Sequence, residues 1–106
     1  MVEDIAPAEF VRRRQENDRW LLIDVREIWE IEVAKIGTAV AIPMMEIPSR
    51  QGELDKARPI AVICHSGGRS RRVADFLFQQ GFAEVVNIAG GIDAWSLEID
   101  STVPRY

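Results

Sequence analysis

Four consecutive apolar residues, Ile60-Ala61-Val62-Ile63, lie in the middle of the chain and are followed at once by polar residues and glycines. A run of this length and composition predicts a short strand with both faces buried, because successive side chains of a strand point to opposite sides. Strands buried on both faces belong to sheets that are covered on both sides. The run therefore favours an α/β fold with the sheet at its centre.

The remainder of the chain alternates between strand-like and helix-like patterns, which strengthens this interpretation. We expect five strands, at residues 2–5, 20–24, 39–42, 60–63 and 85–88. We expect helices between them, at residues 7–17, 27–35 and 69–80, and a last helix that follows Gly90-Gly91 and runs through Trp95. In the second helix, Ile28, Ile31 and Val33 should point partly inward, and Trp29 should fill the core or a pocket wall. Pro43 should end the third strand, and residues 44–59 should form a loop with one short helix. The alternation predicts a three-layer fold with a mostly parallel five-stranded sheet flanked by helices.

The only cysteine of the sequence, Cys64, is placed directly between the predicted strand and the amphipathic helix after it. Gly67 and Gly68 lie between the two elements and can adopt positive φ, so successive N–H groups can turn inward and form an anion-binding nest. A helix N-terminus and neighbouring arginines such as Arg69 stabilise a thiolate. A lone cysteine is commonly an inert buried residue, but this context predicts a reactive thiolate.

The only histidine, His65, directly follows the cysteine. A Cys–His catalytic pair normally joins residues that are distant in sequence, so a cysteine-protease dyad is rejected. One cysteine and one histidine also cannot supply the three or four ligands of a zinc site, so no metal is expected. His65 is interpreted as part of a pocket rim, with an exposed loop histidine of no special function as the alternative.

Length, charge and hydropathy restrict the class of protein. With 106 residues, 47% of them hydrophobic, the chain should form one domain over residues 1–106. The net charge of −4 argues against nucleic acid as a partner, and the local basic run at residues 12–14 is interpreted as a solvated helix face. No segment approaches the roughly 18 apolar residues that a membrane span needs. We therefore expect a cytoplasmic protein with no membrane partner.

Four segments together resemble the rhodanese family of sulfurtransferases. They are Leu22-Ile23-Asp24-Val25-Arg26-Glu27 with Trp29 and Glu30, Ala39-Val40-Ala41-Ile42-Pro43, Cys64-His65-Ser66-Gly67-Gly68-Arg69-Ser70, and Gly90-Gly91-Ile92-Asp93-Ala94-Trp95. They occur in the family's order and span nearly the whole chain, which is long enough for one such domain and too short for a tandem pair.

The resemblance implies a sulfurtransferase that needs no cofactor. Cys64 would be the catalytic residue and would carry a sulfane sulfur as a persulfide. The donor would be bound by the loop residues His65, Ser66, Gly67, Gly68, Arg69 and Ser70. Asp24 and Arg26, which follow another strand, would support the same site if the two strands are neighbours; for Asp24, an ordinary strand-end carboxylate is the alternative. Arg69 would attract an anionic donor or would pair with a carboxylate.

The implied reaction moves sulfur from thiosulfate or another persulfide donor to an external acceptor such as cyanide, a small thiol or a thioredoxin-like protein. Because the chain has no second cysteine, the acceptor must come from outside. A sulfur-relay, sensing or binding module without turnover is the first alternative. A phosphatase or arsenate reductase of related fold is the second, although those loops have one residue more than the four between Cys64 and Arg69. The sequence does not identify the physiological donor, the acceptor, the pathway or the oligomeric state.

Overall fold

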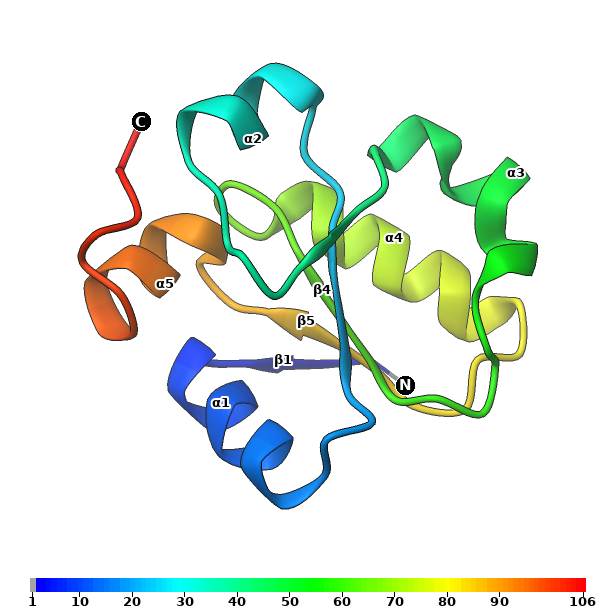
Figure 1. Ribbon diagram of the computed structural model, residues 1–106. Helices are drawn as coiled ribbons and strands as arrows, with labels where there is room; N and C mark the ends of the chain where they lie inside the picture. The colour runs from blue at the N-terminus through cyan, green and yellow to red at the C-terminus, as the bar shows by residue number, and fades with distance from the viewer. Residues whose placement is uncertain (1) are drawn as a thin grey trace.

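The protein is built around one parallel sheet of five strands. The computed structural model describes residues 2–106, so that Met1, which the predicted domain over residues 1–106 includes, lies outside the described residues. The strands are β1 (Glu3–Ile5), β2 (Leu21–Asp24), β3 (Val40–Ala41), β4 (Ile60–Ile63) and β5 (Val85–Ile88). Their order across the sheet is β1-β5-β4-β2-β3, and every neighbouring pair is parallel (Figure 1). The predicted α/β class is confirmed.

Helices cover both faces of this sheet. The α-helices are α1 (Pro7–Glu16), α2 (Ile28–Val33), α3 (Ile47–Arg50), α4 (Gly68–Gln79) and α5 (Gly91–Glu98), and two short 3₁₀ helices, η1 (Met44–Glu46) and η2 (Gln51–Glu53), flank α3. The α3 and α4 helices lie on one face, and α1 and α5 lie on the other (Figure 1). No helix within residues 2–106 has both the length and the apolar character that crossing a bilayer requires.

The central strand β4 divides its side chains between the two faces. Ile60 and Val62 belong to the apolar cluster under α4, whereas Ala61 and Ile63 belong to the cluster under α1 and α5. All four side chains are buried, as the unbroken apolar run predicts. Because side chains alternate along a strand, Cys64 follows the parity of Ile60 and Val62 and lies on the α4 face.

The first helix begins and packs as its sequence indicates. Pro7 is at its first turn, where a missing N–H costs nothing, and Ala6 provides no side-chain cap. Of the basic run, Arg12 pairs with Glu9 and Glu16 at the surface. Arg14 instead lies over the rings of buried Phe10 and Trp95, so the predicted solvated face is solvated only in part.

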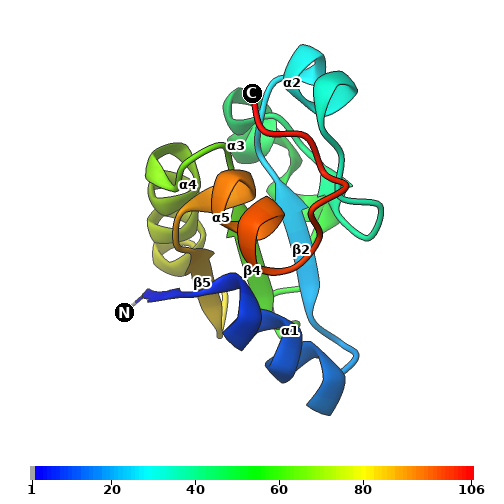
Figure 2. The same cartoon turned by 90° about the vertical axis from the view of Figure 1, so that its left-hand side faces the viewer.

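The α2 helix corrects a prediction about its apolar residues. Ile28 and Val33, expected to point partly inward, are 66% and 47% exposed, and Trp29, expected in the core or a pocket wall, is 61% exposed. The helix lies beyond the carboxyl ends of the strands, next to the C-terminal segment, and does not cover a face of the sheet (Figure 2). Its buried residue is Glu30, which is 3% exposed and makes the polar contacts described below.

Residues 44–59 contain more helix than the expected loop with one short helix. The α3 helix begins with Pro48 in its first turn, and 3₁₀ turns continue it on both sides. Ile47 is fully buried under α4, which fixes this otherwise polar segment to the sheet. Pro48 is tolerated there because the first residues of a helix donate no hydrogen bond within it.

Candidate active site

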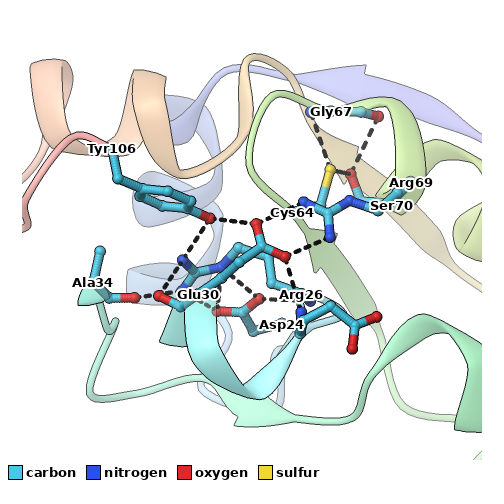
Figure 3. Close-up of polar contacts among 10 residues, drawn as sticks. Asp24, Arg26, Glu30, Ala34, Cys64, Gly67, Arg69, Ser70 and Tyr106 are labelled. Atoms are coloured by element: carbon cyan, nitrogen blue, oxygen red, sulfur yellow. Dashed lines mark hydrogen bonds and ion pairs between the residues drawn. The ribbon is translucent and has the colours of Figure 1, made fainter. Parts of the chain in front are cut away.

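The Cys64 sulfur lies at the carboxyl end of β4, where the chain crosses to α4. Sγ accepts hydrogen bonds from the backbone N–H of Gly67 at 3.1 Å and from the hydroxyl of Ser70 at 3.2 Å (Figure 3). The residue is only 1% exposed. The sulfur is therefore held between two donors at the base of the loop.

The two loop glycines have different roles. Gly67 has a φ of +112° and immediately precedes the first turn of α4, so it makes the turn that only glycine adopts readily. Gly68, which was also expected to be free to take positive φ, is instead the first residue of α4. The N–H groups at the start of this helix have no carbonyl acceptor within it and can serve an anion at the sulfur.

Two hydrogen bonds from α5 fix the orientation of the loop. The N–H of Ile92 donates to the carbonyl of Cys64 at 2.8 Å, and the N–H of Asp93 donates to the carbonyl of His65 at 3.2 Å. In a trans peptide the C=O and the following N–H point in opposite directions. The N–H groups of His65 and Ser66 therefore point away from α5, and the Cys64 side chain lies on that opposite face.

The close approach of α5 to the loop depends on Gly91. Its φ is +59°, and a Cβ there would collide with the backbone carbonyl oxygens of Cys64 and His65. The sequence pattern predicts a helix after Gly90-Gly91 but does not indicate the contact of Gly91 with the loop. Two consecutive glycines at a helix start, Gly90-Gly91, were the signal that could have indicated a close backbone approach.

Ser70 is fully buried, and its hydroxyl has three neighbours that can accept its proton. These are Cys64 Sγ, the carbonyl of Gly67 at 3.2 Å and Oδ1 of Asn87. Asn87, from the middle of β5, also donates from Nδ2 to Asp4 at 2.9 Å. The sequence did not assign a role to Asn87. Its position as the one polar residue of an otherwise apolar strand was the signal that could have indicated one. Since a hydroxyl has one proton, Ser70 serves one acceptor at a time.

Arg69 is paired with a carboxylate, which is one of the two alternatives that the sequence left open. Its two terminal nitrogens lie 2.6 and 2.8 Å from the carboxylate oxygens of Glu30 (Figure 3). Glu30 also accepts from the Tyr106 hydroxyl at 2.7 Å and from the N–H of Glu27 at 3.0 Å. The Arg69 guanidinium, followed by these other donors, lowers the pKa of Glu30 to about 2 against the opposing effect of burial. Glu30 in turn raises the pKa of Arg69.

Asp24 and Arg26 form a second, fully buried ion pair beside the first. β2 and β4 are neighbours, with Asp24 level with Ile63. The Arg26 side chain is entirely buried, and its Nη2 lies 2.7 Å from Asp24. Its remaining N–H groups reach the carbonyls of Glu30 and Ala34 and the Tyr106 hydroxyl (Figure 3). Arg26 therefore contacts the groups that hold Glu30 and does not line an open mouth.

An aromatic stack closes the rim of the loop. The rings of His65 and Tyr106 lie 4.1 Å apart and 14° from parallel, and Trp29 meets Tyr106 edge-on at 6.2 Å. His65 is half-buried at the rim, where the sequence analysis placed it. The sequence did not indicate a role for Tyr106, because only the fold shows that it lies beside a loop some forty residues earlier in the chain.

The outer side of the loop borders a hollow of about 380 Å³ lined by Ser66, Gly67, Gly68, Arg71 and Asn87, among others. Ser66 is exposed there. Within residues 2–106, the hydrogen bonds to the sulfur come from Gly67 and Ser70 and not from Ser66. Within the same residues, no three His, Cys, Asp or Glu side chains lie together in a group that could hold a metal ion.

Comparisons with known proteins agree on one family. A family model described as "Rhodanese-like domain" matches residues 7–98. A "Sulfurtransferase" of Allochromatium vinosum is 38% identical over 96 residues, which cover 91% of this chain and 90% of that protein. The "Rhodanese-like/PpiC domain-containing protein 12, chloroplastic" of Arabidopsis thaliana is 38% identical over 112 residues, and the chain spans 38% of its length. The crystal structure of a rhodanese-like domain protein from Staphylococcus aureus has a TM-score of 0.81 and 30% identity, and the match covers 89% of this chain and 91% of that one.

Replacing Gly91 with alanine should destabilise the protein. The positive φ and the collision with two carbonyl oxygens together should cost about 2 kcal/mol or more in the free energy of unfolding. Gly37→Ala is the matched control, since a Cβ at Gly37 has no atom within 4 Å and needs no positive φ. Urea unfolding measures both variants, and a Gly91→Ala protein as stable as the control would contradict the proposed contact.

Glu30 should make the stability of the protein depend on acid pH. Because its pKa is lowered from 4.5 to about 2 in the folded protein, the unfolded chain binds the proton more readily. The stabilisation is therefore complete above about pH 4.5 and is lost as the pH falls toward 2, by about 3 kcal/mol in total. The free energies of unfolding of wild type and Glu30→Gln should therefore converge as the pH is lowered from about 6 to about 2.5. A constant difference between the two curves would rule out this contribution.

Proposed function

Because the chain belongs to the rhodanese-like domain family, we propose that it is a sulfurtransferase that carries a sulfane sulfur on Cys64 as a persulfide. The observation that supports this most is the position of Sγ, which accepts a hydrogen bond from the N–H of Gly67 and lies 3.2 Å from the hydroxyl of Ser70. Hydrogen-bond donors aimed at a sulfur favour its anionic forms, both thiolate and persulfide. The sulfurtransferase among the relatives is consistent with this chemistry.

The first half-reaction forms the persulfide. The Cys64 thiolate attacks the outer sulfur of a donor such as thiosulfate, the bond between the two donor sulfurs breaks, and sulfite leaves with its electron pair. In the second half-reaction the thiolate of an acceptor attacks the terminal sulfur of the persulfide, and Cys64 leaves as a thiolate. Both steps are displacements at sulfur and consume no oxidant or reductant.

The loop stabilises the negative charge of the intermediate. In this proposal the N–H groups from His65 through Ser70 surround the terminal sulfur that extends from Cys64. The Gly67 N–H, which already donates to Sγ, supports it. Donors of this kind contribute about 3 kcal/mol each to the stabilisation of an anion in comparable sites. Asp24 and Arg26 support the arrangement indirectly, through the carbonyl of Glu30 and the hydroxyl of Tyr106.

The acceptor is an external molecule in this proposal. The sequence contains one cysteine, so no second thiol in the chain can remove the sulfur from Cys64. A small thiol, cyanide or a thioredoxin-like protein fits the role. Free thiols of this kind are characteristic of a reducing compartment, which is the basis for proposing a cytoplasmic location.

A carrier that is loaded and unloaded only by protein partners is the second candidate. A relative supports it: the "Putative sulfur carrier protein YrkF" of Bacillus subtilis is 36% identical over 95 residues, which cover 90% of this chain and 51% of that protein. The 1% exposure of Cys64 means that a bulky partner could reach the sulfur only if the loop or the rim moved. The phosphatase alternative is less consistent with the loop, which has four residues between Cys64 and Arg69 and an arginine already engaged by Glu30.

The proposed function is tested by the mass of the protein after exposure to sulfur donors. Incubation with thiosulfate or an organic persulfide should add one sulfur atom, which cyanide or a thiol removes. Cys64→Ser should remain unmodified, since it lacks the nucleophile. Absence of an adduct from every donor would refute the enzyme proposal, and Cys64-dependent hydrolysis of an aryl phosphate would favour the phosphatase.

A further inference from the structure

Three arginines around the Cys64 loop are paired with carboxylates. Arg69 forms a bidentate pair with Glu30, at 2.6 and 2.8 Å. Arg26 is paired with Asp24 at 2.7 Å, and both are buried. Arg71, on the other side of the loop, is paired with Asp4 at 2.9 Å and with Asp75 at 3.3 Å. These three arginines therefore add no unbalanced positive charge, whereas Arg72, in the second turn of α4, has no carboxylate partner among the ion pairs of residues 2–106.

Arg69 keeps hydrogen-bonding capacity despite this pairing. A guanidinium has five N–H donors, and Glu30 occupies one on each terminal nitrogen. The edge formed by Nε and Nη2 has a free donor on each nitrogen, so Arg69 can still orient a single polar group. Its charge, however, is balanced by a carboxylate that is 3% exposed and therefore poorly screened by solvent.

The two classes of sulfur donor place different amounts of charge in this site. Thiosulfate is a dianion, so its reaction with the Cys64 thiolate gathers three negative charges, and it expels sulfite as a dianion. The sulfurs of an organic persulfide carry one negative charge when ionised, as R–S–S⁻, and none in the form that the thiolate attacks, R–S–SH. An organic persulfide therefore brings less negative charge into the site than thiosulfate does. Like charges in a partly buried site repel strongly, so the neutralised loop disfavours the first class.

The rim of the site suits an organic group better than a sulfonate. His65 and Tyr106 stack at 4.1 Å, and Trp29, 61% exposed, meets Tyr106 edge-on. The exposed Trp29 ring presents apolar area beside this stack and offers contact to the carbon skeleton of a thiol. Figure 3 shows Tyr106 and Arg69 on opposite sides of the Glu30 carboxylate, which joins this rim to the loop.

We infer that the sulfur donor of this protein is an organic persulfide and that Glu30 determines this specificity by neutralising Arg69. The inference rests on the proposed function. The Cys64 thiolate attacks the terminal sulfur of R–S–SH, the Sγ–S bond forms, and the S–S bond of the donor breaks. R–S⁻ leaves with the electron pair, and the proton remains on the new persulfide or moves to the leaving thiolate. One negative charge is present before and after the step.

The test compares rates of Cys64 loading, followed by intact mass, for cysteine persulfide and thiosulfate. Wild-type protein should load at least about tenfold faster from cysteine persulfide. Glu30→Gln leaves Arg69 with an unbalanced charge, and should raise the thiosulfate rate about tenfold, which corresponds to about 1.4 kcal/mol. The cysteine persulfide rate should change much less. The ratio of the two rates is the readout, because a general loss of structure lowers both.

Glu16→Gln is the matched control, since it removes the same charge from an exposed carboxylate of α1 that pairs with Arg12. It should leave the ratio unchanged. A persulfide carried on a protein thiol is added as a third donor, and loading from either persulfide source that is faster than loading from thiosulfate supports the proposal.

Two results would overturn the inference while leaving the proposed function intact. They are wild-type loading from thiosulfate as fast as from persulfides, and a donor ratio that Glu30→Gln does not change in a protein shown to be folded by its melting temperature. If Glu30→Gln does not fold, the wild-type ratio alone decides. Failure of every donor to load Cys64 would instead refute the proposed function.

Discussion

The hydrogen bonds from the start of α5 to the carbonyls of Cys64 and His65 are the contacts on which the rest of the site depends. They turn two peptide units so that the N–H groups face away from α5, and the positive φ of Gly67 then brings a further N–H to the sulfur. The start of α5 must lie very close to the loop for these bonds to form. A side chain at position 91 would collide with the loop carbonyls, so only glycine fits there. The proposed anion site is thus a product of backbone packing between two helix starts.

A buried polar network fixes the other side of the loop. Arg26 has no exposed surface, and an isolated charge in that position would cost several kcal/mol. Its donors are satisfied by Asp24, two carbonyls and the Tyr106 hydroxyl. The Tyr106 hydroxyl in turn donates to Glu30, and Glu30 pairs with Arg69. The network links β2, α2, α4 and the C-terminal segment, so the charge state around Cys64 is set by residues from four separate parts of the chain.

The sequence was sufficient for what depends on local patterns. The apolar run before Cys64 predicts the central strand and, through its alternation, the covered sheet, and the glycines after it predict the turn into α4. Glu30 and Asn87 were not assigned roles, because a buried polar residue is recognisable only when its partner is known. Trp29 was misplaced for the related reason that α2 lies at the end of the sheet, where helical periodicity does not indicate which side is buried. The partner of Arg69 was left open, and only the fold brings Glu30 to it.

The central claim is that the loop amides hold the sulfur that Cys64 carries. A crystal structure of the protein after loading with a persulfide donor tests it most directly. The account predicts one additional sulfur bonded to Sγ, within about 3.5 Å of several N–H groups between His65 and Ser70, a distance suited to hydrogen bonds to sulfur. A terminal sulfur that points out of the loop, with no amide in reach, would contradict the account.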